Sequence, residues 1–267
     1  MERRTIAIGL AAAAGVSIVV AQVVGWWSAT PSWREAVSAV GASIIAAAIP
    51  VIGAVLVARR RPGGVAVLVT AALIGLPAIL YLSYLLASSR PPEDGTSLMV
   101  LHLASQLLLV GAGAAAWGLR DVDRWRWDRV VPSPFVVLGA VVLLPVGATL
   151  VSMHGVLFPL AILVSLDGLD LAMLAQLVVM AGLLSWAARL PRGTAGVVVL
   201  VLLVPRLSES LVRAMGMGDV GLVLGPVAWL GLAAEAALIA TACWWLTRDD
   251  DLPARTDVVA PGRARTS

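Results

Sequence analysis

The sequence predicts an all-α fold, a bundle of eight transmembrane helices, and three observations support it. Sixty per cent of the 267 residues are hydrophobic, 13% are charged, and the mean hydropathy is +0.95. The charges cluster between apolar runs of about 18–25 residues, the length that crosses a hydrocarbon core of roughly 30 Å. Arginines gather in every second connection. Because helices satisfy their own backbone hydrogen bonds, they are the expected form of such runs in lipid.

The first four expected helices are rich in Leu, Ala, Val and Gly and are bounded by Trp or Arg. Their ranges are 5–25, 36–58, 64–87 and 97–118. Trp26 and Trp27 follow the first helix, Arg59–Arg61 follow the second, and Trp117 ends the fourth. Tryptophan prefers the membrane–water interface, so these positions indicate where the helices leave the apolar core.

The last four expected helices are 134–152, 171–188, 194–212 and 222–246, and they complete a membrane domain over 1–246. Trp186 ends the sixth, Pro205 interrupts the seventh, and Trp244 and Trp245 end the eighth. Residues 155–166 are apolar but too short to span, which favours an interfacial or re-entrant segment. The acidic, proline-containing tail 247–267 is expected to be disordered. No convincing internal repeat is visible in the sequence.

The arginines predict the orientation. All 19 cationic residues are Arg, with no Lys and no Asn, which suggests a GC-rich bacterial source. Fifteen of them lie on one side: Arg3, Arg4, Arg59–Arg61, Arg120, Arg124, Arg126, Arg129, Arg189, Arg192, Arg248, Arg255, Arg263 and Arg265. The positive-inside rule therefore places both termini in the cytoplasm of a bacterial cell, with the protein in the cytoplasmic membrane. A cleaved signal peptide at the first segment is the alternative, and it would leave seven helices.

Charged residues inside the apolar runs are the leading candidates for a site. Arg206 and Glu209 follow Pro205 in the seventh run, and Glu235 lies near the middle of the eighth. If these two helices are antiparallel neighbours, Arg206 and Glu235 reach a similar depth and offset two charges that are costly in lipid. The pair is either a proton, ion or substrate site or a structural ion pair that holds two helices in register.

Further polar residues concentrate in the outer halves of the helices. From this group we assign Asp170, Gln106 and His102 to an outward-facing polar pocket between the fourth to eighth expected helices, together with the charged residues above. Such a pocket, open outward and closed inward by aliphatic residues, is typical of a site for a small ligand. Separate hydrogen bonds between helices are the alternative explanation.

A second, independent candidate is a metal site at the outer face. Met99 and His102 lie three residues apart on one helix face, and Met153 and His154 close the fifth run at the same level. Thioether and imidazole ligands together select Cu(I). Ordinary packing of methionine and the interfacial preference of histidine explain the same pattern. No other cofactor is expected, and the single Cys243 allows no internal disulfide.

One family resemblance concerns about a quarter of the chain. The run Ala54-Val-Leu-Val-Ala-Arg-Arg-Arg-Pro-Gly-Gly-Val-Ala-Val-Leu68, followed by Arg124-Trp-Arg-Trp127, resembles the multi-helix sensor region ahead of the kinase core in some actinobacterial sensor histidine kinases. The chain has no kinase core, so the resemblance implies a stand-alone sensor or a partner subunit.

Three functions remain open on the sequence. The first is binding or translocation of a small solute, without catalysis, in the outward pocket. The second is a membrane-embedded enzyme on a lipid or isoprenoid substrate, with Glu209 or Glu235 as general acid. The third is a sensor or assembly subunit. The expected partners are the lipid bilayer and a small-molecule or lipid ligand. A protein partner or a homo-oligomer is also compatible with the sequence. Nucleic acid is not expected, because the basic residues lie at the membrane edge.

Overall fold

The computed structural model describes residues 2–28, 33–87, 96–119, 133–154, 168–207, 210–211 and 221–247. These residues form helices and short turns, with no strand among them. The elements are α1 (Glu2–Ser28), α2 (Trp33–Ala58), α3 (Pro62–Ala87), α4 (Thr96–Trp117), α5 (Ser133–His154), α7 (Gly168–Ala187), α8 (Arg192–Leu203), the 3₁₀ turn η1 (Val204–Arg206) and α10 (Gly221–Thr247). The predicted all-α class is confirmed.

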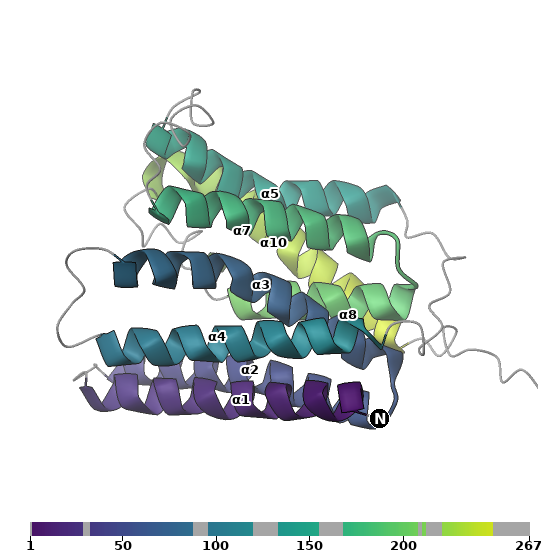
Figure 1. Cartoon of the computed structure of the whole chain (residues 1–267). Coiled ribbons are helices and arrows are strands. Elements are labelled where there is room, and N and C mark those ends of the chain that lie inside the picture. The colour runs from purple at the N-terminus through teal and green to yellow at the C-terminus, as the bar shows by residue number, and fades with distance from the viewer. Residues whose placement is uncertain are drawn as a thin grey trace, which may run out of the picture.

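The long helices of the described residues pack as two groups of four with the same neighbour order. In the first group α1 contacts α2, α2 contacts α3, α3 contacts α4, and α4 returns to α1. In the second group α5, α7, α8 and α10 close a ring in the same order. The groups meet mainly where α3 packs against α7 and α8, and Figure 1 shows α3 between α4 and α7. The fold thus repeats an arrangement that the sequence does not reveal.

Small residues allow the close packing of the first group. The side of α1 that faces its neighbours carries residues three or four apart: Ala7, Ala11, Ala14, Ile18 and Ala21, all buried. Across the group, a side chain at Gly113 of α4 would collide with Ala72 of α3. Small residues let two helix backbones approach, which is how helices associate where lipid supplies no hydrophobic drive.

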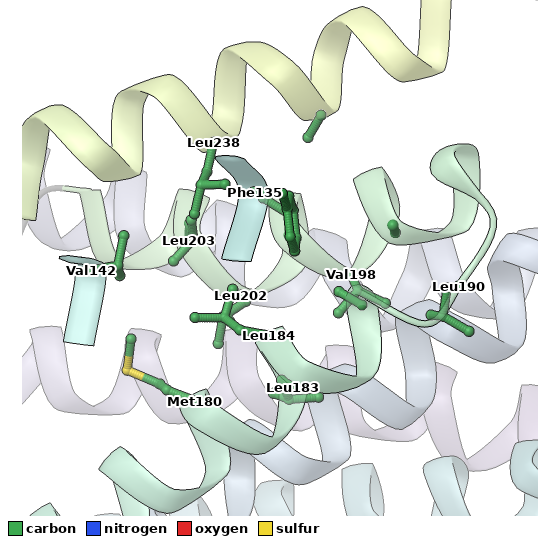
Figure 2. Close-up of a cluster of buried hydrophobic side chains, with 14 of the residues drawn as sticks. Phe135, Val142, Met180, Leu183, Leu184, Leu190, Val198, Leu202, Leu203 and Leu238 are labelled. Carbon is green, nitrogen blue, oxygen red and sulfur yellow. The ribbon is translucent and has the colours of Figure 1, made fainter. Parts of the chain in front are cut away.

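Larger aliphatic side chains fill the second group. The cluster contains Phe135 and Val142 of α5, Met180, Leu183 and Leu184 of α7, Val198, Leu202 and Leu203 of α8, and Leu238 of α10. Figure 2 shows Leu238 pointing from α10 toward α8, where Leu203 lies. Because α8 contributes so many of these side chains, its position is fixed by packing on three neighbours.

Four of the described helices are long and apolar enough to cross a membrane by length and composition alone. These spans are Glu2–Gly25, Gly63–Ala87, Thr96–Trp117 and Gly225–Thr247. Shorter apolar stretches lie at Ile44–Ala58, Pro134–Pro145 and Leu171–Ala187. Large hydrophobic side chains are exposed on the outside of the bundle, for example Val16 at 65% and Val137 at 63%. Many exposed large apolar side chains are typical of a surface that faces lipid.

One end of the bundle gathers the described connections that carry arginine, and we call it the arginine end. It holds Arg3, Arg4, Arg59, Arg60, Arg61, Arg189 and Arg192. The first turn of α1 and the last turn of α10 both lie there (Figure 1). Aromatic pairs join helices at the same end, Trp117 with Trp186 at 6.4 Å and Phe135 with Trp245 at 5.4 Å between ring centroids. The helices therefore alternate in direction along the chain.

Candidate functional site

Pro205 sets the position of Arg206. Proline has no N–H and its ring clashes with the carbonyl four residues earlier, so a helix cannot continue through it undisturbed. Helix α8 accordingly ends at Leu203, and the chain tightens into η1, in which the Leu207 N–H donates to the Val204 carbonyl. The seventh expected helix, 194–212, therefore does not continue as one α-helix, because a 3₁₀ turn replaces the α-helix at Val204. The half-buried Arg206 therefore lies on a short 3₁₀ turn that contacts α8 of the second helix group and α2 of the first.

Arg206 and Glu235 line one small cavity. Arg206 lies 14 residues beyond Arg192, and Glu235 lies 12 residues before Thr247. At 1.5 Å per residue, these positions are about 21 and about 18 Å from the arginine end. The cavity has a volume of about 10 Å³, and Glu235 is only 4% exposed. This is room for about one water molecule, so the two charged groups line the same small space.

The close approach of α5 and α10 closes the far wall of this cavity. Gly231 of α10 lies directly against the ring of Pro145 on α5, where a side chain at residue 231 would collide. Val142 of α5 also lines this cavity, and Ser210 adds a residue with a hydroxyl group to its lining. The surroundings of Glu235 are thus apolar on the α5 side and polar on the α8 side.

A larger cavity lies between the two helix groups. Its volume is about 390 Å³, within the range of small-molecule sites. Three polar side chains reach it: Tyr81 of α3, Gln176 of α7 and Arg206 of η1. The remaining wall is mostly apolar and includes Met173 and Met180 of α7. A mainly apolar cavity with a few convergent polar groups suits a ligand with an apolar body and one polar end.

Arg206 lines both cavities, whereas Glu235 lines only the small one. The guanidinium group carries five N–H donors in a planar fork and can bind a carboxylate on more than one edge. It can therefore face Glu235 on one side and a ligand in the large cavity on the other. The arrangement provides one cation between a buried carboxylate and a ligand-sized space.

The other predicted site residues on α4 lie elsewhere. The Oε1 atom of Gln106 is 2.6 Å from where a Cβ atom on Gly75 would be, so Gln106 faces α3 within the first helix group. His102 and Met99 are both partly exposed on α4. None of the three lines either cavity. They belong to a different part of the bundle from Arg206 and Glu235.

Several predictions fall outside the described residues. They concern Glu209, the segment 155–166 and the tail 248–267, together with the side chains of Asp170, Met153 and His154. The copper site thus stays a prediction. Within the described part of the chain, no group of three or more His, Cys, Asp or Glu residues is placed to hold a metal ion.

Sequence reasoning placed the pocket among the fourth to eighth helices and did not include α3. The polarity of Tyr81 and Gln176 is visible in the sequence, but their convergence depends on α3 packing against α7, which no local pattern indicates. The sequence also contains no indication that Met173 and Met180 would lie on one apolar wall of the large cavity.

Comparisons of the chain with protein-family models, with curated proteins and with solved structures found no match. The resemblance to sensor regions of histidine kinases therefore stays a prediction from the sequence.

Proposed function

We propose that the protein is a multi-pass membrane protein that binds, and carries across the bilayer, a small organic anion in the large cavity. In this proposal eight helices cross the bacterial cytoplasmic membrane and both termini face the cytoplasm. The ligand has an apolar body, which packs against the methionine-lined wall, and one anionic group, which meets Arg206.

The observation that carries the proposal is the position of Arg206 on the wall of a 390 Å³ cavity between two helix groups. Transporters built from structural repeats hold their substrates near the bilayer midplane between the repeats, beside interrupted helices. The break at Pro205, the two similar groups and the cavity between them agree with that arrangement.

The first helix group argues against a purely structural role for the charges. There α4 packs on α3 through uncharged groups, with Gln106 against Gly75 and Gly113 against Ala72. In the first group, then, the described residues of the fourth helix pack on the third without a charged pair. A buried ion pair is also weak evidence for stability, because its desolvation cost often equals its attraction.

The same geometry disfavours Glu235 as a general acid. A general acid must reach its substrate, but Glu235 lines a space for about one water molecule and not the large cavity. Glu209, the other candidate acid, lies outside the described residues. An assembly subunit without a ligand needs no cavity of 390 Å³ between its two helix groups. A sensor that binds the same anion uses the same site as a transporter, and flux through the membrane separates the two.

Binding of 2-naphthoate to the purified protein in lipid nanodiscs tests the proposal. This aryl carboxylate carries one anionic group on an apolar body, and 2-naphthamide and 2-naphthylmethylammonium are its neutral and cationic counterparts. We expect 2-naphthoate to bind at least thirtyfold more tightly than either, a difference of about 2 kcal/mol or more. Equal binding of all three compounds contradicts an anion site.

Two variants locate the binding. Arg206→Gln combined with Glu235→Gln removes both charges together, leaves no uncompensated buried charge, and is expected to abolish the preference for 2-naphthoate. Arg192→Gln makes the same change at an exposed position of α8 near the arginine end and is expected to change affinity by less than about twofold. An undiminished preference in the double variant would place the site elsewhere.

A further inference from the structure

We propose that Glu235 takes up one proton for each anion that binds at Arg206, so that anion and proton occupy the protein together. The inference rests on the proposed function and adds a second substrate, the proton, to the same site. Its basis is the unequal access of the two charged residues: Arg206 lines both cavities, and Glu235 lines only the small one.

The surroundings of Glu235 make it dependent on Arg206. Helix α5 faces the small cavity with Val142 and Pro145, which carry no charge, and the segment after α8 faces it with Arg206 and Ser210. Helix α10 itself adds Ala228, Gly231 and Leu232. Among the described residues that line this cavity, Arg206 is the only cation. A carboxylate that is 4% exposed relies on such a partner to remain ionised.

An anion in the large cavity competes for that partner. Two carboxylates that share one site in a low-dielectric interior do not both remain ionised, because each disfavours the charge on the other. The ligand meets Arg206 from the more open large cavity and stays anionic, so the buried Glu235 is the group that accepts the proton. The 10 Å³ beside Glu235 accommodates about one water molecule, through which a proton can arrive.

The charges balance in this step. Before binding, the site holds one guanidinium cation and one carboxylate anion. The ligand brings one negative charge, and a hydronium ion or a buffer acid supplies one proton. An O–H bond forms on Glu235 as the bond that held this proton in its donor breaks, and the conjugate base stays in solution. The net charge of the site is unchanged, so transport of the anion with its proton is electroneutral.

Titration calorimetry of the wild-type protein in nanodiscs with 2-naphthoate is the first test. At each pH from 6 to 8, the titration is repeated in two buffers of different ionisation enthalpy, which gives the number of protons taken up. Carboxylic acids ordinarily titrate near pH 4, so the probe stays ionised throughout. We expect uptake of about one proton and an affinity that falls about tenfold per pH unit.

The variant Glu235→Gln is expected to bind 2-naphthoate without proton uptake and with an affinity independent of pH. At pH 8 it should therefore bind about tenfold or more tightly than the wild type. Glu2→Gln, the same change at an exposed residue of α1, should retain the wild-type pH dependence.

The outcomes separate the two proposals. Binding of 2-naphthoate to the wild type without proton uptake overturns this inference and leaves the anion site standing. Proton uptake that persists in Glu235→Gln assigns the proton to another group and also overturns it. No preference for 2-naphthoate in the wild type removes the proposed function and this inference together. If Glu235→Gln does not fold, the wild-type titration alone still decides.

Discussion

Arg60 adopts a left-handed backbone conformation, φ 58°, in the turn between α2 and α3. The Arg61 N–H donates to the Leu56 carbonyl at 2.9 Å and the Arg60 N–H donates to the Val57 carbonyl at 3.1 Å. This is a Schellman motif, in which the left-handed position is usually glycine. The left-handed conformation of an L-residue other than glycine is unfavourable by about 1–2 kcal/mol, so the backbone at Arg60 is strained.

Arg60→Gly is expected to stabilise the folded protein by roughly 1 kcal/mol, because glycine adopts the left-handed conformation without steric cost. Chemical unfolding of the protein in detergent measures the change. Arg59→Gly, one residue earlier and outside the left-handed position, is the control and should give no such gain. Equal stability of Arg60→Gly and Arg59→Gly would show that the turn is not strained.

At the scale of elements, the contact between α5 and α10 determines where Glu235 lies. Gly231 is one helical turn before Glu235, and the ring of Pro145 occupies the space beside its backbone. Any side chain at residue 231 must push α10 away from α5 or rotate it. Because Val142 of α5 and Leu238 of α10 are buried in one core cluster, the interior offers little room for such a shift.

Gly231→Ala is expected to destabilise the protein by about 1–3 kcal/mol, the usual cost of overpacking a filled interior, and to weaken 2-naphthoate binding. Gly182→Ala in α7 is the matched control, since no atom lies within 4 Å of the position of its added Cβ. That change should be neutral or stabilising by about 0.5–1 kcal/mol. Thermal and chemical unfolding of both variants compare them, and a harmless Gly231→Ala would contradict the close contact.

At the scale of the whole molecule, the alternating helix directions bring the described arginine-rich connections to one end (Figure 1). Cationic connections are retained on the cytoplasmic side during insertion. The arginine end is therefore the end that we expect to face the cytoplasm, together with both termini.

Cysteine labelling tests this orientation. In a Cys243→Ala background, Ser97→Cys places a thiol at an exposed position of the first turn of α4, and Arg60→Cys places one at the arginine end. A membrane-impermeant maleimide added to intact cells should label the residue-97 variant and should label the residue-60 variant only after permeabilisation. The reverse labelling pattern would show that the arginine end faces the outside of the cell.

The sequence predicted the helices closely and their arrangement poorly. Seven of the eight ranges agree with the observed bounds within three residues at each end, because apolar length and flanking Arg, Trp and Pro determine where a helix can start and stop. The exception is the end of the seventh range, where η1 follows α8. The shared cavity of Arg206 and Glu235 agrees with the expected antiparallel pair. The large cavity could not be predicted, since it depends on which helices of the two groups meet.

Photolabelling with 4-benzoylbenzoate, an aryl carboxylate whose benzophenone group crosslinks on irradiation, tests the central claim most directly. If an organic anion occupies the large cavity, peptide mapping should place the crosslinks at Met173, Met180 or Tyr81, excess 2-naphthoate should suppress them, and the double variant Arg206→Gln with Glu235→Gln should lack them. Crosslinks confined to the lipid-facing surface, at exposed residues such as Val16 and Val137, and insensitive to 2-naphthoate, would contradict the account.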